Sequence, residues 1–233
     1  MGMGEKKVEG LLEWADFLGL LEDRSRPGSQ VLTPLAQSLI ELPDLPTSTP
    51  ALEILYAQMV RNHPLLAQLV QQFAYNVSQQ FDPSFDMQTY RDALLSIGRS
   101  FDVKPDFLLK RAPIYLDALT NPSNLGRLGL LVRVGKDRVR VNPHRPDWRV
   151  AGYLVYSSWP LNAGRVHIQE LVAGRGGLGR VFLLSEGQVM GVLAKLEQEG
   201  AIALEIVADL RQIGPNPSMR AEDFLEMLLN DRN

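Results

Sequence analysis

The segment at 121–142 reads NPSNLGRLGLLVRVGKDRVRVN, and it decides the fold that the sequence predicts. Apolar and basic residues alternate strictly at 138–141, and such alternation is typical of a strand with one buried face. Residues 135–137, Gly-Lys-Asp, supply tight-turn chemistry between this run and the apolar run before it. The segment therefore predicts a short β-hairpin, apolar inside and cationic outside, that follows the end of a helix.

A helix, a short apolar phrase and a hairpin form the order in which a winged-helix unit ends. The same order recurs in three places, at 14–32, 116–141 and 193–213, with little residue identity among them. We therefore expect a mainly α protein with small β-hairpins, an α+β fold of tandem winged-helix-like units. The predicted divisions are a partial winged-helix unit at 1–42, a helical connector at 43–86, a winged-helix unit with a basic wing at 87–142 and a C-terminal winged-helix-like unit at 143–233.

Hydrophobic residues at helical spacing predict the helices that surround these hairpins. Thr33 with Pro34 and Ser185 with Gln188 supply N-terminal capping signals. The first unit lacks the helices that normally precede its hairpin, so we expect the chain to begin inside a domain. Residues 81–86 and 174–180 are expected to be loops. The predicted helices lie at 5–18, 51–62, 65–79, 87–99, 105–119, 148–159, 166–173, 186–198 and 221–229.

Composition excludes several classes of protein. Cysteine is absent, which removes disulfides, thiolate nucleophiles and cysteine-type zinc sites. No apolar run approaches the roughly 18 to 20 residues that cross a bilayer, and the N-terminus lacks the apolar core of a signal peptide. We expect a cytoplasmic protein that does not enter a membrane.

Charge is segregated along the chain, although the net charge is only -3. Residues 99–182 hold 14 basic and 6 acidic residues, a net +8, between flanks of -6 (1–98; 6 basic, 12 acidic) and -5 (183–233; 4 basic, 9 acidic). A positive middle favours a local footprint for a polyanion. The alternative is a basic face that pairs with the acidic flanks or with a protein partner.

The basic hairpin is the best-motivated site, because guanidinium groups bind phosphates in a bidentate manner. Binding to double-stranded DNA there would be largely electrostatic and salt-dependent. The alternative for the two cations on the helix at 105–119 is a solvated helix face. The helices at 5–18 and 186–198 are poor groove readers, so they are not expected to recognise a DNA sequence. The predicted nucleic-acid-binding residues are Arg133, Lys136, Arg138 and Arg140 on the hairpin, Arg145 and Arg149 beyond it, Lys110 and Arg111 on the helix, and Arg175 and Arg180 in a glycine-rich stretch.

That glycine-rich stretch, 174–179, spells G-x-G-x-x-G. A dinucleotide site needs a strand before the motif and a helix that opens on its last glycine. Here a helix is expected before it and an apolar stretch after it. The motif therefore predicts a turn between two helices and no cofactor, with its two arginines available to phosphates as the lesser alternative.

No set of residues points to catalysis. The three histidines, His63, His144 and His167, have no metal-ligand spacing, and no nucleophile elbow or paired acidic motif occurs. We expect a protein that is not an enzyme and holds no metal or cofactor. A nuclease is the alternative, and it would require Asp82, Asp86 and Asp92 to converge on a divalent cation.

Three phrases together resemble a known family: MGMGEKKVEGLLEWADFLGLL at 1–21, VLTPLA at 31–36 and GRVFLLSE at 179–186. They are similar to the prokaryotic domain-of-unknown-function family numbered 4007, whose members tend to be encoded beside DNA phosphorothioation and related phage-defence genes. In that family a further segment precedes the opening phrase, so the resemblance implies a version shortened at its N-terminus. An aspartate-rich phrase of the family is replaced here by ELPDLPTS at 41–48. The resemblance supplies no active-site residues.

We therefore expect a non-catalytic DNA-binding or adaptor subunit of a bacterial DNA-modification or phage-defence system. Its partners would be duplex DNA, contacted through the cationic wing, and other proteins of such a complex, and a homodimer is compatible with the sequence. The alternative is a protein-interaction subunit whose winged helices serve dimerisation or docking, or a transcriptional regulator without a direct defence role.

Overall fold

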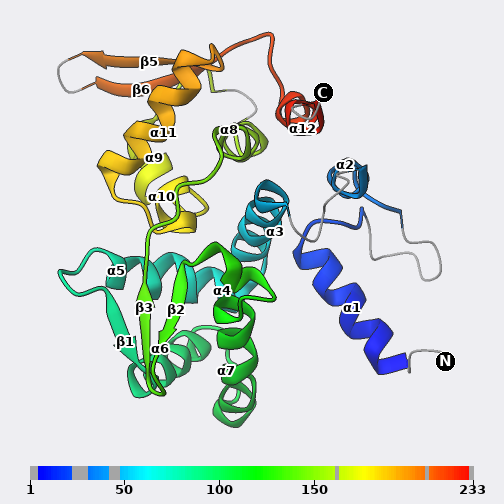
Figure 1. Cartoon of the computed structure of the whole chain (residues 1–233), viewed down its shortest axis with the longest axis vertical. Coiled ribbons are helices and arrows are strands. Elements are labelled where there is room, and N and C mark those ends of the chain that lie inside the picture. Colours follow the sequence, from blue (N-terminus) through cyan, green and yellow to red (C-terminus); the bar gives the residue numbers. More distant parts are fainter. Residues whose placement is uncertain (1–4, 23–30, 42–47, 161–162, 208–209, 231–233) are drawn as a thin grey trace.

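The computed structural model describes residues 5–22, 31–41, 48–160, 163–207 and 210–230, with only the backbone described at 5–10. Helices α1 (Glu5–Phe17) and α2 (Pro34–Glu41) lie at one side of the molecule (Figure 1). Two units follow, each built around a small antiparallel sheet. The first contains α3 (Thr49–Asn62), α4 (Pro64–Gln68), the π-helical turn η1 (Leu69–Ala74), α5 (Tyr75–Ser78), β1 (Ser84–Asp86), α6 (Met87–Arg99), α7 (Pro105–Thr120), the 3-10 turn η2 (Leu125–Leu128), β2 (Leu131–Val134) and β3 (Arg138–Val141).

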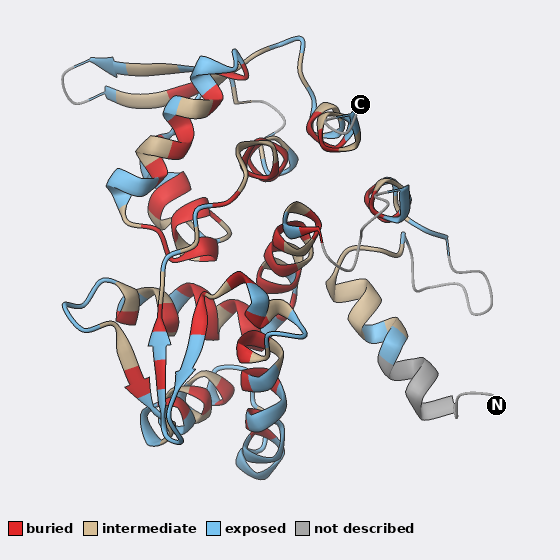
Figure 2. Cartoon of the chain, viewed as in Figure 1, coloured by how far each residue is buried: buried red, intermediate tan, exposed pale blue. Residues whose placement is uncertain are grey.

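The first sheet has the strand order β1-β3-β2. Directly paired residues of antiparallel strands lie on the same face, and the pairs are Phe85 with Val139 and Leu131 with Val141. All four side chains are at most 5% exposed, so this face covers the core, against α6 and α7. The other face of the hairpin is exposed (Figure 2).

The second unit repeats this arrangement. It contains α8 (Trp148–Ser157), β4 (Val166–His167), α9 (Ile168–Ala173), α10 (Leu178–Phe182), α11 (Glu186–Gln198), β5 (Ile202–Val207), β6 (Leu210–Pro215) and α12 (Ala221–Asn230). The sheet order is β4-β6-β5. Helix α12 packs on α8, where Gly152 lets the ring of Phe224 approach the backbone.

Helix α3 joins the two units through one continuous core. The hydroxyl of Tyr56 on α3 donates to the carbonyl oxygen of Val181, 2.9 Å away in the second unit. The buried carboxylate of Glu53 accepts from His144 Nε2 at 2.7 Å and from the backbone N–H of Asp147 at 3.0 Å. These bonds fix the segment that connects the two sheets.

Most predicted elements are confirmed, including α6, α7, α11 and the hairpin of β2 and β3. Of the first predicted hairpin, the described residues show one bridge, between Leu21 and Leu32, and its expected loop at 24–29 lies outside the described residues. The structure is mainly helical with two small sheets, so the α+β expectation is confirmed at that level. Among the described helices, none is both long and apolar enough to cross a membrane.

Three local predictions are wrong. Residues 84–86 form strand β1 instead of a loop, and residues 166–167 form strand β4 instead of the first turn of a helix. Both strands are short, and each is held by a partner that lies far along the chain. The third error is in the stretch expected to be a turn, because α10 begins there at Leu178.

Candidate nucleic-acid interface

Arg138 and Arg140 lie on the outer face of β3. Their neighbours across the hairpin are Val134 and Val132, both exposed. The sequence alternation places the two guanidinium groups on this face because Val139 between them is buried. The predicted cationic outer side of the wing is therefore present, but its members differ in how they are bound.

Arg138 is held within the sheet. Its Nε donates to Ser84 Oγ at 2.9 Å, and its Nη2 forms an ion pair with Asp82. An acidic residue of the chain's N-terminal half thus neutralises this arginine, as the pairing alternative anticipated. Arg138 is not a free phosphate ligand in this conformation.

Arg133 lies on the other face of the sheet. It is paired in register with the buried Val139, and its Nε donates to Thr120 Oγ1 at 3.2 Å. Arg133 and Arg140 therefore lie on opposite faces of the sheet. The physical reason is the period of two, which puts Arg133 on the same face as Leu131.

Lys136 and Arg140 are exposed and have no carboxylate partner among the described residues. Lys136 is in the hairpin turn, where Gly135 adopts a φ of 72° that an L-residue rarely takes. The two cations are therefore available on the outer side of the wing.

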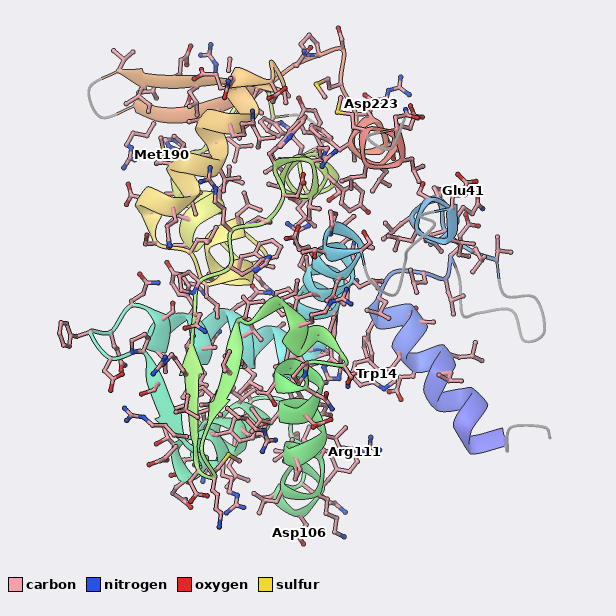
Figure 3. All side chains as sticks on the ribbon, viewed as in Figure 1. Trp14, Glu41, Asp106, Arg111, Met190 and Asp223 are labelled. Carbon is pink, nitrogen blue, oxygen red and sulfur yellow. The ribbon has the colours of Figure 1, made fainter. Side chains whose placement is uncertain are left out.

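Helix α7 belongs to the same unit and exposes Lys110 and Arg111. Arg111 lies over the ring of Phe107, 5.2 Å from its centroid, and is labelled on the lower part of α7 in Figure 3. The same helix also exposes apolar side chains, with Phe107 48% and Ile114 51% exposed. Its outward surface is thus mixed, cationic and apolar.

Arg145 and Arg149 follow the wing but differ in their surroundings. Arg149 forms two hydrogen bonds with the carboxylate of Asp147, at 2.9 and 2.8 Å, and is largely buried. Burial would raise the pKa of Asp147, but the hydrogen bonds from Arg149 outweigh it and lower that pKa. Arg145 is exposed and makes one long contact, 3.4 Å, to the carbonyl oxygen of Gly191. Of the two, only Arg145 presents its charge to solvent.

Arg175 and Arg180 lie in the second unit, at the turn from α9 to α10. The glycines here serve close packing: a Cβ at Gly177 would lie 2.5 Å from the carbonyl oxygen of Glu170, and one at Gly179 would lie 2.1 Å from that of Val172. Helix α9 precedes the motif, so the strand of a dinucleotide fingerprint is lacking at this place. The structure does not bring these two arginines onto the outer face of the hairpin.

The acidic residues of the nuclease alternative have separate roles. Asp82 pairs with Arg138, Asp86 caps α6 by accepting from the N–H of Thr89, and Asp92 accepts from a side-chain amide. The hydrogen bond from the Thr89 backbone lowers the pKa of Asp86. Within the part of the chain that the structure describes, no three His, Asp or Glu side chains form a group that could hold a metal ion.

One residue escaped the sequence reading. Arg61 on α3 donates to the carbonyl oxygens of Gly176 and Leu154, in the other unit. In the sequence it is a single arginine at the end of an apolar helix. Its partners lie 93 to 115 positions further along the chain, so the local sequence does not predict them.

Together the fold and this surface define a mainly helical protein of two units, each with a small three-stranded sheet, and with exposed cations on the first unit. No family model and no curated protein sequence matches the chain. By structure the chain is similar to a magnesium-ion-bound crystal structure of SspB, with a TM-score of 0.76 and 14% identity, covering 99% of this chain and 77% of that one. A second SspB crystal structure gives a TM-score of 0.70 and 17% identity over the same shares of both chains. At these identities the likeness shows the fold.

Proposed function

We propose that this chain is a non-catalytic DNA-binding or adaptor subunit of a bacterial DNA-modification or phage-defence system. The surface that would contact the duplex backbone is the outer face of β3 with the hairpin turn, and the basic stretch of α7 extends it. The observation that carries the proposal is the pair Lys136 and Arg140, both exposed and neither bound to a carboxylate among the described residues. Exposed cations without a carboxylate partner are what a phosphate backbone attracts.

The connectivity supports the further proposal that the two units are winged helices. The first runs α5, β1, α6, α7, β2, β3 with sheet order β1-β3-β2, which is a helix, a strand, two helices and a hairpin. The second runs α8, β4, α9, α10, α11, β5, β6 with the matching order β4-β6-β5. In this arrangement α7 and α11 are the helices before the hairpins, the place from which such units approach a duplex.

The system in which the protein would act is proposed from the sequence resemblance to the family numbered 4007. The similarity in fold to SspB is compatible with that assignment and supplies no residue roles. The proposed partners are duplex DNA and other proteins of the same complex.

Binding to a labelled duplex at several salt concentrations tests the proposal. Each lost phosphate contact should reduce the slope of log K against log salt by about 0.9. The variant Lys136→Ala/Arg140→Ala should therefore bind more weakly at low salt and with a slope smaller by about 1.8. The control is Lys195→Ala/Arg211→Ala, which removes the same number of charges from the second unit, at two half-buried cations that are each paired with a glutamate.

If the two double variants bind the duplex equally, the wing does not contact DNA. Undetectable binding by the wild type at low salt would sink the DNA proposal altogether. A folded state of each variant is checked by circular dichroism.

The second candidate is a protein-docking subunit, and the apolar part of α7 favours it. Phe107 and Ile114 are about half exposed on the helix that the first unit presents. Such side chains suit burial in a protein interface better than contact with phosphates. A co-purified partner that is lost in Phe107→Ser/Ile114→Ser and retained in Lys136→Ala/Arg140→Ala would favour docking over DNA binding.

A further inference from the structure

A second site is built where the two units meet, away from the hairpin. A cavity of about 560 Å³ is bordered by α3, η1, α8, α9 and the glycine-rich turn. This volume is within the range of sites that bind small molecules, about 300 to 1,000 Å³. A smaller hollow adjoins it, because Gln71 and Arg175 line both.

The turn that borders the cavity is held rigidly from the first unit. Arg61 Nε and Nη2 donate to the carbonyl oxygen of Gly176 at 3.0 and 2.8 Å. Gln71 Oε1 accepts from the N–H of the same residue at 2.7 Å, and Gly176 has a φ of 76°. Both backbone groups of one glycine are thus bound, so the turn is preorganised for a ligand.

Three arginines surround this turn without a carboxylate partner among the described residues. Arg61 lines the larger cavity, Arg180 lines the smaller hollow, and Arg175 lines both. The Nε of Arg180 is buried and has no hydrogen-bond partner, while its guanidinium lies 5.7 Å from the ring centroid of Tyr75. Buried cationic donors without an acceptor cost free energy that an anion would recover.

Arg61 is a buried cation whose guanidinium group has one nitrogen without a hydrogen-bond partner among the described residues. Its Nη1 makes no hydrogen bond among the described residues, although Nε and Nη2 are both bound. Burial lowers the pKa of Arg61 to about 10, which leaves it cationic at neutral pH. A neighbouring negative charge would relieve the cost of that burial.

The rest of the cavity wall selects the kind of anion. Its apolar part includes the side chains of Trp159, Val166 and Leu171. Glu170 also lines the cavity, and its negative charge would disfavour a ligand that is anionic throughout. The wall suits a ligand with a phosphate at one end, a flat apolar body, and a hydrogen-bond donor for Glu170.

We propose that this cavity binds a nucleoside monophosphate whose base carries an amino group. The phosphate is bound by Arg61 and Arg175 beside the glycine-rich turn, with Arg180 in the adjoining hollow. The base lies against Trp159 and donates its amino group toward Glu170. The site is separate from the hairpin and does not depend on the proposed DNA binding.

Isothermal titration with AMP, adenosine and inorganic phosphate tests the site on the intact chain. AMP should bind, and adenosine and phosphate should each bind at least about tenfold more weakly, because each lacks one half of the contacts. Absence of AMP binding at millimolar concentration would overturn the proposal. So would equal binding of AMP and either fragment.

Arg175→Ala is the informative variant, because this exposed side chain makes no hydrogen bond that holds the fold together among the described residues. Loss of one charge-assisted phosphate contact should weaken AMP binding by about tenfold to a hundredfold and leave adenosine binding unchanged. The control is Arg140→Ala, which removes an exposed arginine from the hairpin and should leave AMP binding unchanged. An equal loss in both variants, or a loss in neither, would refute the assignment. AMP binding tests the cavity, and duplex binding tests the hairpin. Because AMP binding by Arg140→Ala and duplex binding by Arg175→Ala are measured separately, a failure of the AMP proposal is distinguishable from a failure of the DNA proposal.

Discussion

Glu53 provides the sharpest test of how the two units are held together. Its side chain is 3% exposed and accepts from His144 Nε2 at 2.7 Å and from the N–H of Asp147 at 3.0 Å. Both donors lie in the connecting segment, more than 90 positions along the chain from Glu53. Glu53→Ala removes the acceptor of both bonds and leaves two donors without a partner.

The magnitude follows from these contacts. A hydrogen bond to a charged group contributes about 1.5 to 3 kcal/mol, and breaking a buried pair by removing one partner costs about 3 to 5 kcal/mol. We expect Glu53→Ala to lower the free energy of unfolding by about 3 to 5 kcal/mol. Glu53→Gln keeps one acceptor oxygen at nearly the same volume, so its cost should be about 1.5 to 3 kcal/mol.

Urea unfolding measures the effect, followed by tryptophan fluorescence and by far-ultraviolet circular dichroism. With an m-value of about 2 to 3 kcal/mol per molar urea, the midpoint for Glu53→Ala should fall by about 1 to 2.5 M. The control is Glu226→Ala, which removes an exposed carboxylate from α12 and should change the midpoint little. A midpoint for Glu53→Ala within 0.3 M of that control, a threshold of about 1 kcal/mol, would refute the reasoning.

Three further predictions concern stability. Gly152→Ala places a Cβ 2.2 Å from Phe224 Cε1. The substitution should therefore lower the free energy of unfolding by about 1 to 3 kcal/mol in the same urea assay. A smaller loss would mean that the ring can move aside. Gly191→Ala on α11 meets nothing within 4 Å and should raise stability by about 0.5 to 1 kcal/mol, which a fall in midpoint would contradict. Burial lowers the pKa of His63, whose Nδ1 accepts from the N–H of Leu66, so the folded state resists protonation that the unfolded chain accepts. Stability should therefore fall as pH drops below about 6.5, and His63→Asn, which keeps a cap acceptor without titrating, should show a smaller loss of Tm between pH 7 and 5.5. An identical loss in wild type and variant would assign the acid sensitivity to other groups.

Local signals in the sequence predicted much of the fold. In residues 138–141 the basic side chains are exposed and the valines are buried, as the alternation of the sequence predicted. The capping box of Ser185 and Gln188 is formed at the start of α11. Both patterns depend on neighbours within a few residues, so they can be read without knowledge of the rest of the chain.

The missed elements depend on distant parts of the chain. Strand β1 has three residues and pairs with β3 more than 50 positions later, so neither its length nor its composition distinguishes it from a loop. The face of Arg133, by contrast, could have been predicted, because it is two residues after the apolar Leu131 and must share its side of the strand. The contacts of Arg61 could not have been predicted, because its carbonyl partners come from α8 and the glycine-rich turn.

The basic middle of the chain divides in the structure into cations that are paired with carboxylates and exposed cations that have no carboxylate partner among the described residues. Arg138 and Arg165 are paired with Asp82 and Glu205 of the acidic flanks. Arg149 is paired with Asp147 inside the basic middle itself. Of the remaining cations, Lys110, Arg111, Lys136 and Arg140 lie on α7 and the hairpin, and Arg175 and Arg180 lie at the glycine-rich turn. A charge-reversal screen over residues 99–182 would mix these groups with the paired arginines and lower stability and binding together. Substitutions confined to one group at a time separate the three contributions. Among these residues only Arg149, whose side chain is 15% exposed, should change the free energy of unfolding by more than about 1 kcal/mol, because the exposed pair of Arg138 contributes about 0 to 1 kcal/mol.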